Sequence, residues 1–197
     1  MPATLKKKIA MQDDVFSGIS AVFATADELP TDLDLSAVNF VEFPVSDDSG
    51  FNFDTGQASI EHFKVKGLNA DWVNTFTPGE GEIKLEIPCH DTDIMTLVGM
   101  TGTSVSATLP SGMTVSGGTS ATGQAYSAPQ KAVYLGLVIL NDTEDKIFFI
   151  KKGKFSVQVI NDGSNKPLCV VLTGSIAKGA DAKAIGICDI AAPSGNG

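Results

Sequence analysis

The richest chemistry in the sequence lies in PCHDTD, residues 88–93, which holds one of the three cysteines and one of the two histidines. A cysteine beside a histidine could supply a nucleophile and a general base. Adjacent residues rarely converge on one substrate, however, and catalytic Cys–His pairs come from distant parts of a chain. Pro88 lacks the N–H that would continue a strand, and aspartates suit the unpaired N–H groups at a helix start. We therefore interpret the stretch around Cys89 and His90 as a strand-to-helix junction.

The rest of the sequence offers no partners that would complete a catalytic site. His62 lies in the alternating segment ASIEHFKV, which favours a wet or interface face of a strand. The cysteines are odd in number and lack CxxC spacing, so we expect reduced thiols rather than a zinc site. Phosphate-cradling glycine motifs and the Gly-x-Ser-x-Gly elbow are absent. The sequence predicts no catalytic residues, no cofactor and no metal, and hence a protein that is not an enzyme.

Charge excludes one class of partner. The chain has 197 residues and a formal net charge of −9, and all 14 basic residues are lysines. Because tight nucleic-acid binding relies on basic patches in which arginine is prominent, we expect none here. The only basic cluster, residues 6–8, is interpreted as part of a solvated tail. Apolar residues make up 43% and charged residues 19%, which is typical of a globular chain.

The start of the chain imitates an export signal but breaks its pattern. Asp13 and Asp14 interrupt the segment where an uncharged apolar core would have to run. No stretch approaches the roughly 18 consecutive apolar residues of a membrane span. We expect a soluble chain that is made in the cytoplasm and has no membrane partner.

Most periodic segments alternate at period two, the pattern of strands. In EIKLEI and KFSVQV one side of the strand is apolar and the other polar, whereas AVYLGLVIL and KIFFI are apolar on both faces. NDTED between the last two is turn chemistry, so they form a hairpin. We expect the C-terminal half to be an antiparallel meander of about four strands. The expected strands span 37–45, 58–67, 70–76, 82–87, 132–140, 146–150, 154–159, 166–177 and 184–190.

One short helix is predicted from Asp91 to Gly99. Ile94, Leu97 and Val98 fall at i, i+3 and i+4, an aspartate or threonine can cap the first turn, and the glycine can end it. A weaker helical or irregular stretch is expected over residues 12–26.

The expected domain organisation is an N-terminal arm over residues 1–30, a single β-sandwich or barrel domain over 31–190, and a flexible tail over 191–197. Residues 94–130 carry no charged side chain, and a low-charge loop or hairpin is expected at 100–130. In one interpretation it is a flexible loop, or a small hairpin that turns at Pro110-Ser111-Gly112 and returns through Met113 and Val115. In the other, it is a surface covered by a neighbouring subunit.

The order of these elements resembles phage tail tube proteins, also called major tail proteins, and the related tube proteins of type VI secretion. GEGEIKLEIPCHDTDIMTLVG (79–99) is similar to the family's strand that runs through a proline and aspartates into its single helix. KAVYLGLVILNDTEDKIFFIKKGKFSVQV (131–159) resembles its hairpin and the strand that follows, and PLCVVLTGSIA (167–177) resembles its closing strand.

The resemblance implies a mainly β protein, an antiparallel sandwich or barrel with one short flanking helix. It further implies a structural virion protein of a phage or prophage, a homo-oligomer whose hexameric rings stack into a tail tube with other tail proteins, assembled in the host cytoplasm. An acidic lumen would repel DNA phosphates and let DNA pass. Glu42, Glu82 and Glu86 are candidates for its lining.

Two other classes of protein remain open. The period-two strands equally suit a monomeric β-sandwich binding module, such as an adhesin or a capsid decoration domain. An enzyme would need a convergent nucleophile, base and orienting group, which the sequence does not show.

Overall fold

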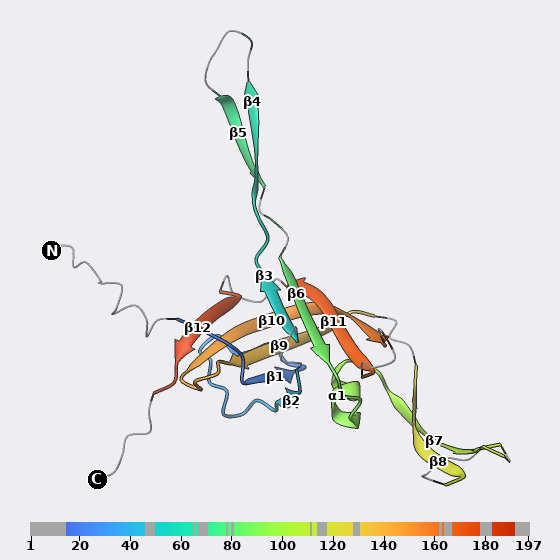
Figure 1. The fold of residues 1–197 in the computed structure, drawn as a ribbon. Coiled ribbons are helices and arrows are strands. Elements are labelled where there is room, and N and C mark those ends of the chain that lie inside the picture. The colour runs from blue at the N-terminus through green and yellow to red at the C-terminus, as the bar shows by residue number, and fades with distance from the viewer. Residues whose placement is uncertain are drawn as a thin grey trace, which may run out of the picture.

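Antiparallel strands dominate the computed structural model of the chain (Figure 1). It describes residues 15–45, 50–64, 66, 71–77, 79, 81–110, 112–113, 118–127, 131–161, 163, 167–177 and 183–191, with the backbone alone at 63–64 and 71–74. The elements are β1 (Ala21–Thr25), β2 (Val41–Phe43), β3 (Phe51–Asp54), β4 (Ser59–Lys64), β5 (Asp71–Thr77), β6 (Glu82–Ile87), α1 (Thr92–Leu97), β7 (Gly102–Thr108), β8 (Ser120–Tyr126), β9 (Val133–Leu140), β10 (Lys146–Ile160), β11 (Cys169–Ile176) and β12 (Ile185–Asp189).

Eight strands form one antiparallel sheet in the order β2-β1-β9-β10-β11-β6-β3, with β12 paired to β10. The end strands β2 and β3 do not pair with each other in the described part of the chain, so the sheet stays open. The expected class, a mainly antiparallel β protein with one short helix, is confirmed. The barrel form of that expectation is wrong, because no closed ring of strands exists among the described residues.

The long strand β10 bends at a bulge that changes which residues face the core. Ile150 pairs with Leu137 of β9, whereas Gly153 pairs with Leu135, so β10 carries one extra residue. Because side chains alternate along a strand, one extra residue reverses which of them point inward. Ile150 and Phe155 are both fully buried in the same core as a result. The two segments expected at 146–150 and 154–159 are therefore one continuous strand.

Two strands share one edge of β10. β11 pairs with residues 153–160 of β10 and β12 pairs with residues 146–150, and both run antiparallel to it. The strand order β9, β10, β11 confirms three strands of the expected meander. The expected position of the last strand is wrong, because β12 pairs with the first half of β10 and not with β11. The bulge explains this, because the bend leaves the edge of the first half open for a second strand.

The main core lies on the inner face of the curved sheet, under α1. It collects fully buried side chains from widely separated elements, and each contributes about 1.5–3 kcal/mol by leaving water. Its members include Phe43 of β2, Leu85 of β6, Met95 of α1, Leu137 of β9 and Phe155 of β10. In β6 the alternation predicted for EIKLEI is confirmed, with Ile83, Leu85 and Ile87 buried.

A smaller core covers the opposite face of the sheet. Leu29 packs there against Val138 of β9 and Phe149 of β10, with side chains of residues 33–40 around it. The same loop is fixed to the bulge, because the N–H of Leu29 donates to the Lys151 carbonyl at 3.0 Å. The Lys152 ammonium pairs with Glu28 at 3.0 Å. The segment between β1 and β2 therefore serves as a cover for this half of the sheet.

The predicted helix is confirmed as α1, and its start is capped as expected. The Asp91 carboxylate accepts a hydrogen bond from the N–H of Asp93 at 2.9 Å, which satisfies one of the unpaired donors of the first turn. No helix in the described residues is long and apolar enough to cross a membrane.

The helix ends at Gly99, which adopts φ +78°. Its N–H donates to the Thr96 carbonyl at 3.0 Å, and the N–H of Met100 donates to the Met95 carbonyl at 2.8 Å. This pair of bonds is the Schellman closure, which needs a left-handed residue at this position. It turns the chain so that Met95 and Met100 both pack into the core.

The structure adds two strands that the sequence analysis did not predict and shortens a third. β1 lies within residues 12–26, where a helical or irregular stretch was expected, and β3 begins at Phe51. β2 keeps only three residues of the strand expected over 37–45. The lysine cluster at 6–8 and residues 192–197 of the expected tail lie outside the described residues.

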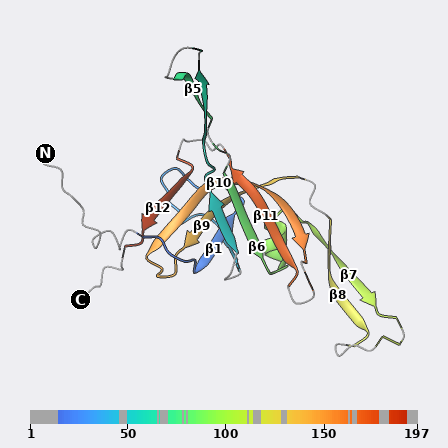
Figure 2. The same cartoon turned by 45° about the horizontal axis from the view of Figure 1, so that its top comes forward.

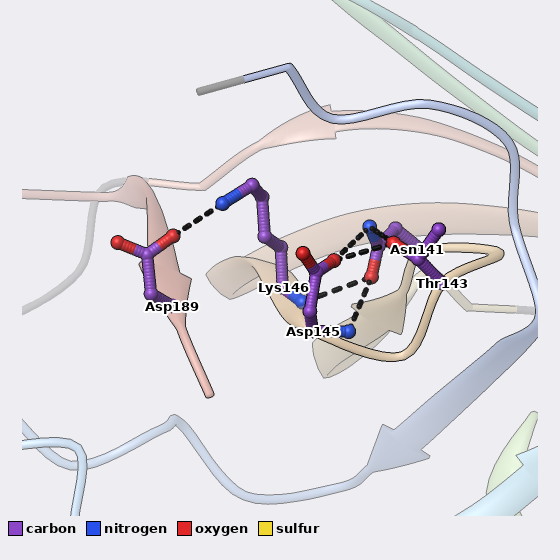
Figure 3. A network of polar contacts seen from close by, with 5 residues as sticks. All are labelled: Asn141, Thr143, Asp145, Lys146 and Asp189. Atoms are coloured by element: carbon purple, nitrogen blue, oxygen red, sulfur yellow. Dashed lines mark hydrogen bonds and ion pairs between the residues drawn. The ribbon is translucent and has the colours of Figure 1, made fainter. Parts of the chain in front are cut away.

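A polar network fixes the turn between β9 and β10 (Figure 3). The buried Asn141 side chain donates to the Thr143 hydroxyl and to the Asp145 carboxylate, each at 2.7 Å. The side-chain Oδ1 of Asn141 accepts hydrogen bonds from the backbone N–H groups of Asp145 and Lys146 at 3.1 and 2.9 Å. Donation by Thr143, and then by Asn141, lowers the pKa of Asp145 below its usual 3.8. The turn expected at NDTED is thus confirmed, and hydrogen bonds of the Asn141 side chain hold it together.

Two hairpins project from the body on different sides (Figures 1 and 2). β4 pairs with β5 and β7 pairs with β8, and neither pair joins the eight-stranded sheet. We call them the β4–β5 arm and the β7–β8 arm. Two-stranded hairpins are marginally stable alone in water, so each arm presents surface that a partner could stabilise.

Candidate assembly surface

The PCHDTD stretch has the structural role that the sequence predicted. Cys89 is half-buried against the core, and Asp91 caps α1. His90 is exposed. Cys89, Cys169 and Cys188 are all half-buried and form no disulfide.

The other candidate side chains lie apart from this junction. His62 sits on the β4–β5 arm, is exposed, and lies opposite Asn74 in the strand register. Among the described residues, no group of three or more His, Cys, Asp or Glu side chains could hold a metal ion.

The uncharged stretch contains the β7–β8 arm, a hairpin whose return strand differs from the one expected. The N–H of Leu109 donates to the Thr119 carbonyl at 2.7 Å, and the return strand β8 begins at Ser120. The expected return through Met113 and Val115 is wrong. Val115 lies outside the described residues, and Met113 lies in the connection.

The β7–β8 arm has one polar and one apolar face. The register places Ser106 opposite Thr122, and Ser104 opposite Gln124, whose amide donates to the Ser104 hydroxyl at 3.2 Å. The other face carries small apolar side chains, although nearly all residues of both strands are exposed. They are Val105, Ala107, Ala121 and Ala125, and the same face also holds Thr103 and Gly123. An alternating strand pair normally buries such a face, and the body of this subunit does not cover it.

The acids proposed for a lumen are not gathered on one surface. Glu82 and Glu86 both lie on the outward side of β6, opposite its buried residues. Asp54 of β3 faces Glu82 directly, and Lys84 pairs with Glu86 at 2.7 Å. Glu42 is exposed on β2, and β1, β9, β10 and β11 separate it from β6 in the sheet.

A pocket of about 660 Å³ opens beside α1. Elements far apart in the sequence form its walls, and its lining holds no aspartate, glutamate or lysine. Its polar side chains are His90, Gln124 and Gln158. Its apolar side chains are Met95, Met100, Tyr126, Val157, Val159 and Leu168.

The exposed apolar side chains gather in a few places. Val159 and Leu168 lie at the pocket, with exposed fractions of 37% and 48%. On the β4–β5 arm, Ile60 and Phe76 face each other across the two strands and are 55% and 64% exposed. Sequence reasoning missed this pair because it depends on the register of β4 against β5. It predicted both strands, but not which residues would meet.

These features define a β protein with an open sheet, two projecting arms and an uncharged pocket. No protein-family model and no curated protein matches the chain. Among solved structures, it is similar to a chain in the "Cryo-EM structure of the anti-feeding prophage (AFP) baseplate, 6-fold symmetrised". The match covers 88% of this chain and 95% of that chain, with 12% sequence identity and a TM-score of 0.42. At that score the likeness establishes neither a shared fold nor a shared role.

Proposed function

We propose that this chain is a structural subunit of a phage or prophage-derived tail tube and that its copies associate side by side into stacked rings. The sequence resemblance to tail tube proteins suggests this role. The observation that carries the proposal is the β7–β8 arm, whose two strands hold no charged residue and expose an apolar face.

Leaving that face in water forfeits the stabilisation that burial of apolar side chains would provide. Covering it with a neighbouring copy recovers this stabilisation without burying any charge. Association of identical subunits also closes or protects the edges at β2 and β3, which are unpaired among the described strands and would otherwise template uncontrolled pairing. Self-assembly therefore accounts for both the uncharged arm and the open sheet.

The charge of the chain suits passage of DNA without binding. A net charge of −9 with no arginine repels phosphates, and on the outward side of the sheet Glu82 of β6 lies directly opposite Asp54 of β3. Glu86 lies further along the same side of β6, where it pairs with Lys84. In this role the partners are further copies, in rings of six by the family resemblance, and other tail proteins of the virion. The protein acts by assembly, with no chemical step and no cofactor.

Light scattering over a wide concentration range, with negative-stain microscopy of the same samples, tests the proposal. We expect mass to rise with concentration and rings or short tubes to be visible. Val105→Asp places a charge on the apolar face of the β7–β8 arm and should suppress assembly. Ser106→Asp places the same charge on the polar face and should have a smaller effect.

A monomeric binding module is the second candidate function, and the uncharged pocket beside α1 is the observation that favours it. A molecule that stays monomeric at every concentration tested, with both arms intact, would support this alternative and contradict the tube proposal.

A further inference from the structure

We infer that the pocket beside α1 receives the Ile60–Phe76 pair of a second copy, so that subunits join head to tail. This inference rests on the proposed self-assembly and names the surfaces that make one of its contacts. We call Ile60 and Phe76 the apolar pair. Both members lie on one face of the β4–β5 arm, directly opposite each other, and both are more than half exposed.

The described part of the subunit leaves the apolar pair more than half exposed. Side chains directly opposite each other on antiparallel strands stand about 4.5–5.5 Å apart, so the two form one compact apolar surface. Figures 1 and 2 show the β4–β5 arm standing clear of the sheet and of α1 in both views. The pocket beside α1 therefore lies away from the apolar pair of the same molecule, and a second copy is the occupant that this chain itself supplies.

The pocket matches the apolar pair in chemistry. Met95 and Met100 form its floor, where both are almost fully buried, and Val159 and Leu168 are exposed at its edge. Methionine side chains adapt to aromatic rings and make favourable sulfur–aromatic contacts. A volume of about 660 Å³ lies within the range of about 300–1,000 Å³ that holds ligands larger than two side chains. The volume is therefore large enough for the side chains of Phe76 and Ile60.

Charge also favours this contact over others between copies. Each chain carries a net charge of −9, so most surfaces of two copies repel each other. Neither the apolar pair nor the pocket lining contains an aspartate, glutamate or lysine, so docking desolvates no charged group there. His90, Gln124 and Gln158 can bond to the polar groups of the arm that surround the apolar pair.

The contact is heterologous, because the surface on one copy differs from the surface on the next. Such contacts repeat around a ring when the rotation closes, and along a filament when it does not. A ring of subunits is the arrangement that the proposed function requires.

Two variants test the apolar pair and the pocket one at a time. Phe76→Glu disables the apolar pair and leaves the pocket intact, and Leu168→Glu does the reverse. Both side chains are exposed, so folding should be retained, which circular dichroism and thermal unfolding can verify. Each variant alone should weaken self-association about tenfold to a hundredfold, the loss expected when one large apolar side chain is no longer buried. Thr77→Glu adds the same charge to the opposite face of the arm, across from the uncharged Ser59, and is the matched control.

Mixing the two variants gives the decisive result. A Phe76→Glu molecule offers a working pocket and a Leu168→Glu molecule offers a working apolar pair, so one junction can form between them. With Val105→Asp added to both molecules to suppress association through the β7–β8 arm, we expect one-to-one heterodimers in sedimentation velocity and no larger species. Assembly of both variants at the wild-type level would overturn the inference and leave the proposed function standing. A wild-type protein that never self-associates would overturn both.

A photoreactive phenylalanine analogue at position 76 provides a second, direct readout. In a mixture of isotopically labelled and unlabelled protein, cross-links from position 76 should join two different chains and map to Met95, Met100 or Leu168. Cross-links that stay within one chain, or that map to another surface, would show that the pocket does not receive the pair.

Discussion

Lys146 and Asp189 lie directly opposite each other on β10 and β12, and the Lys146 Nζ lies 2.6 Å from the Asp189 Oδ1 (Figure 3). The lysine side chain is 9% exposed and the aspartate side chain 80% exposed. This ion pair therefore anchors an edge strand, which pairs with β10 alone among the described strands, to the body of the sheet.

We expect Asp189→Asn to lower the free energy of unfolding by about 1 kcal/mol, since the exposed partner limits the strength of the pair. Removing the carboxylate also leaves the buried ammonium less well satisfied. Chemical denaturation measures the loss, and hydrogen exchange should show faster opening of β12. Asp27→Asn, which removes the same charge from an exposed loop position, is the control. Equal stability of the two variants would contradict the anchoring role.

Asp91→Ala should destabilise α1, because the Asp91 carboxylate caps the N–H of Asp93. We expect a loss of about 1 kcal/mol, the usual effect of removing an N-cap side chain. Asp91→Ser keeps an oxygen acceptor and should restore most of the stability. Thermal unfolding of the three proteins checks this order. Because α1 carries Met95 into the pocket, self-association should weaken in parallel with helix stability.

Thr143→Ala should raise the pKa of Asp145 toward its usual 3.8, because the Thr143 hydroxyl is the main cause of the lowered value. A carboxyl with a lowered pKa stabilises the folded state above pH 3.8, and this contribution is lost as the pH falls through the folded pKa. The variant should thus be less stable than the wild type at neutral pH and converge with it in acid. Carboxyl titration by NMR and denaturation at both pH values measure the two effects. A stability difference that widens in acid would contradict the sign.

Self-association should strengthen with salt. Copies with a net charge of −9 repel each other, and raising the ionic strength from about 0.01 M to about 0.15 M shortens the screening length from about 30 Å to about 8 Å. Lowering the pH toward the pI of about 4.5 should act in the same direction. Light scattering at fixed protein concentration checks both trends. Dissociation on adding salt would instead indicate that opposite charges hold the copies together.

Charge reversal should reveal which acids face a channel. We expect assemblies that carry Glu82→Lys and Glu86→Lys to retain DNA in a salt-sensitive way, because lysines would then neutralise phosphates. Glu42→Lys tests the distant strand β2 and serves as the comparison. Retention of labelled DNA by purified assemblies provides the measurement. If only Glu42→Lys retains DNA, the outward side of β6 does not line the channel.

The sequence predicted the elements whose pattern is local. EIKLEI alternates without interruption and became β6, and the helix at 91–99 had its own cap and its own closing glycine. β10 was divided in the prediction because the bulge between Ile150 and Gly153 breaks the period-two pattern. β1 was missed because its inward residues, Val22 and Ala24, are only two, and one of them is small.

The candidate site was less predictable because tertiary structure assembles it. The pocket joins Tyr126 of β8, Val157 of β10 and Leu168 before β11, and no spacing in the sequence relates these residues. His90 drew attention as a possible base, whereas the structure places it on the pocket rim. The apolar pair depends on strand register, which hydrophobic pattern alone does not determine on an exposed hairpin.

The arms of this subunit stand on different sides of its body, and with the pairing of arm and pocket proposed above, any unfinished row of copies has two unlike ends. One end displays an empty pocket and the other a bare hairpin face. Growth at the two ends can therefore proceed at different rates, and a capping protein needs to imitate only one of the two surfaces to stop elongation in one direction.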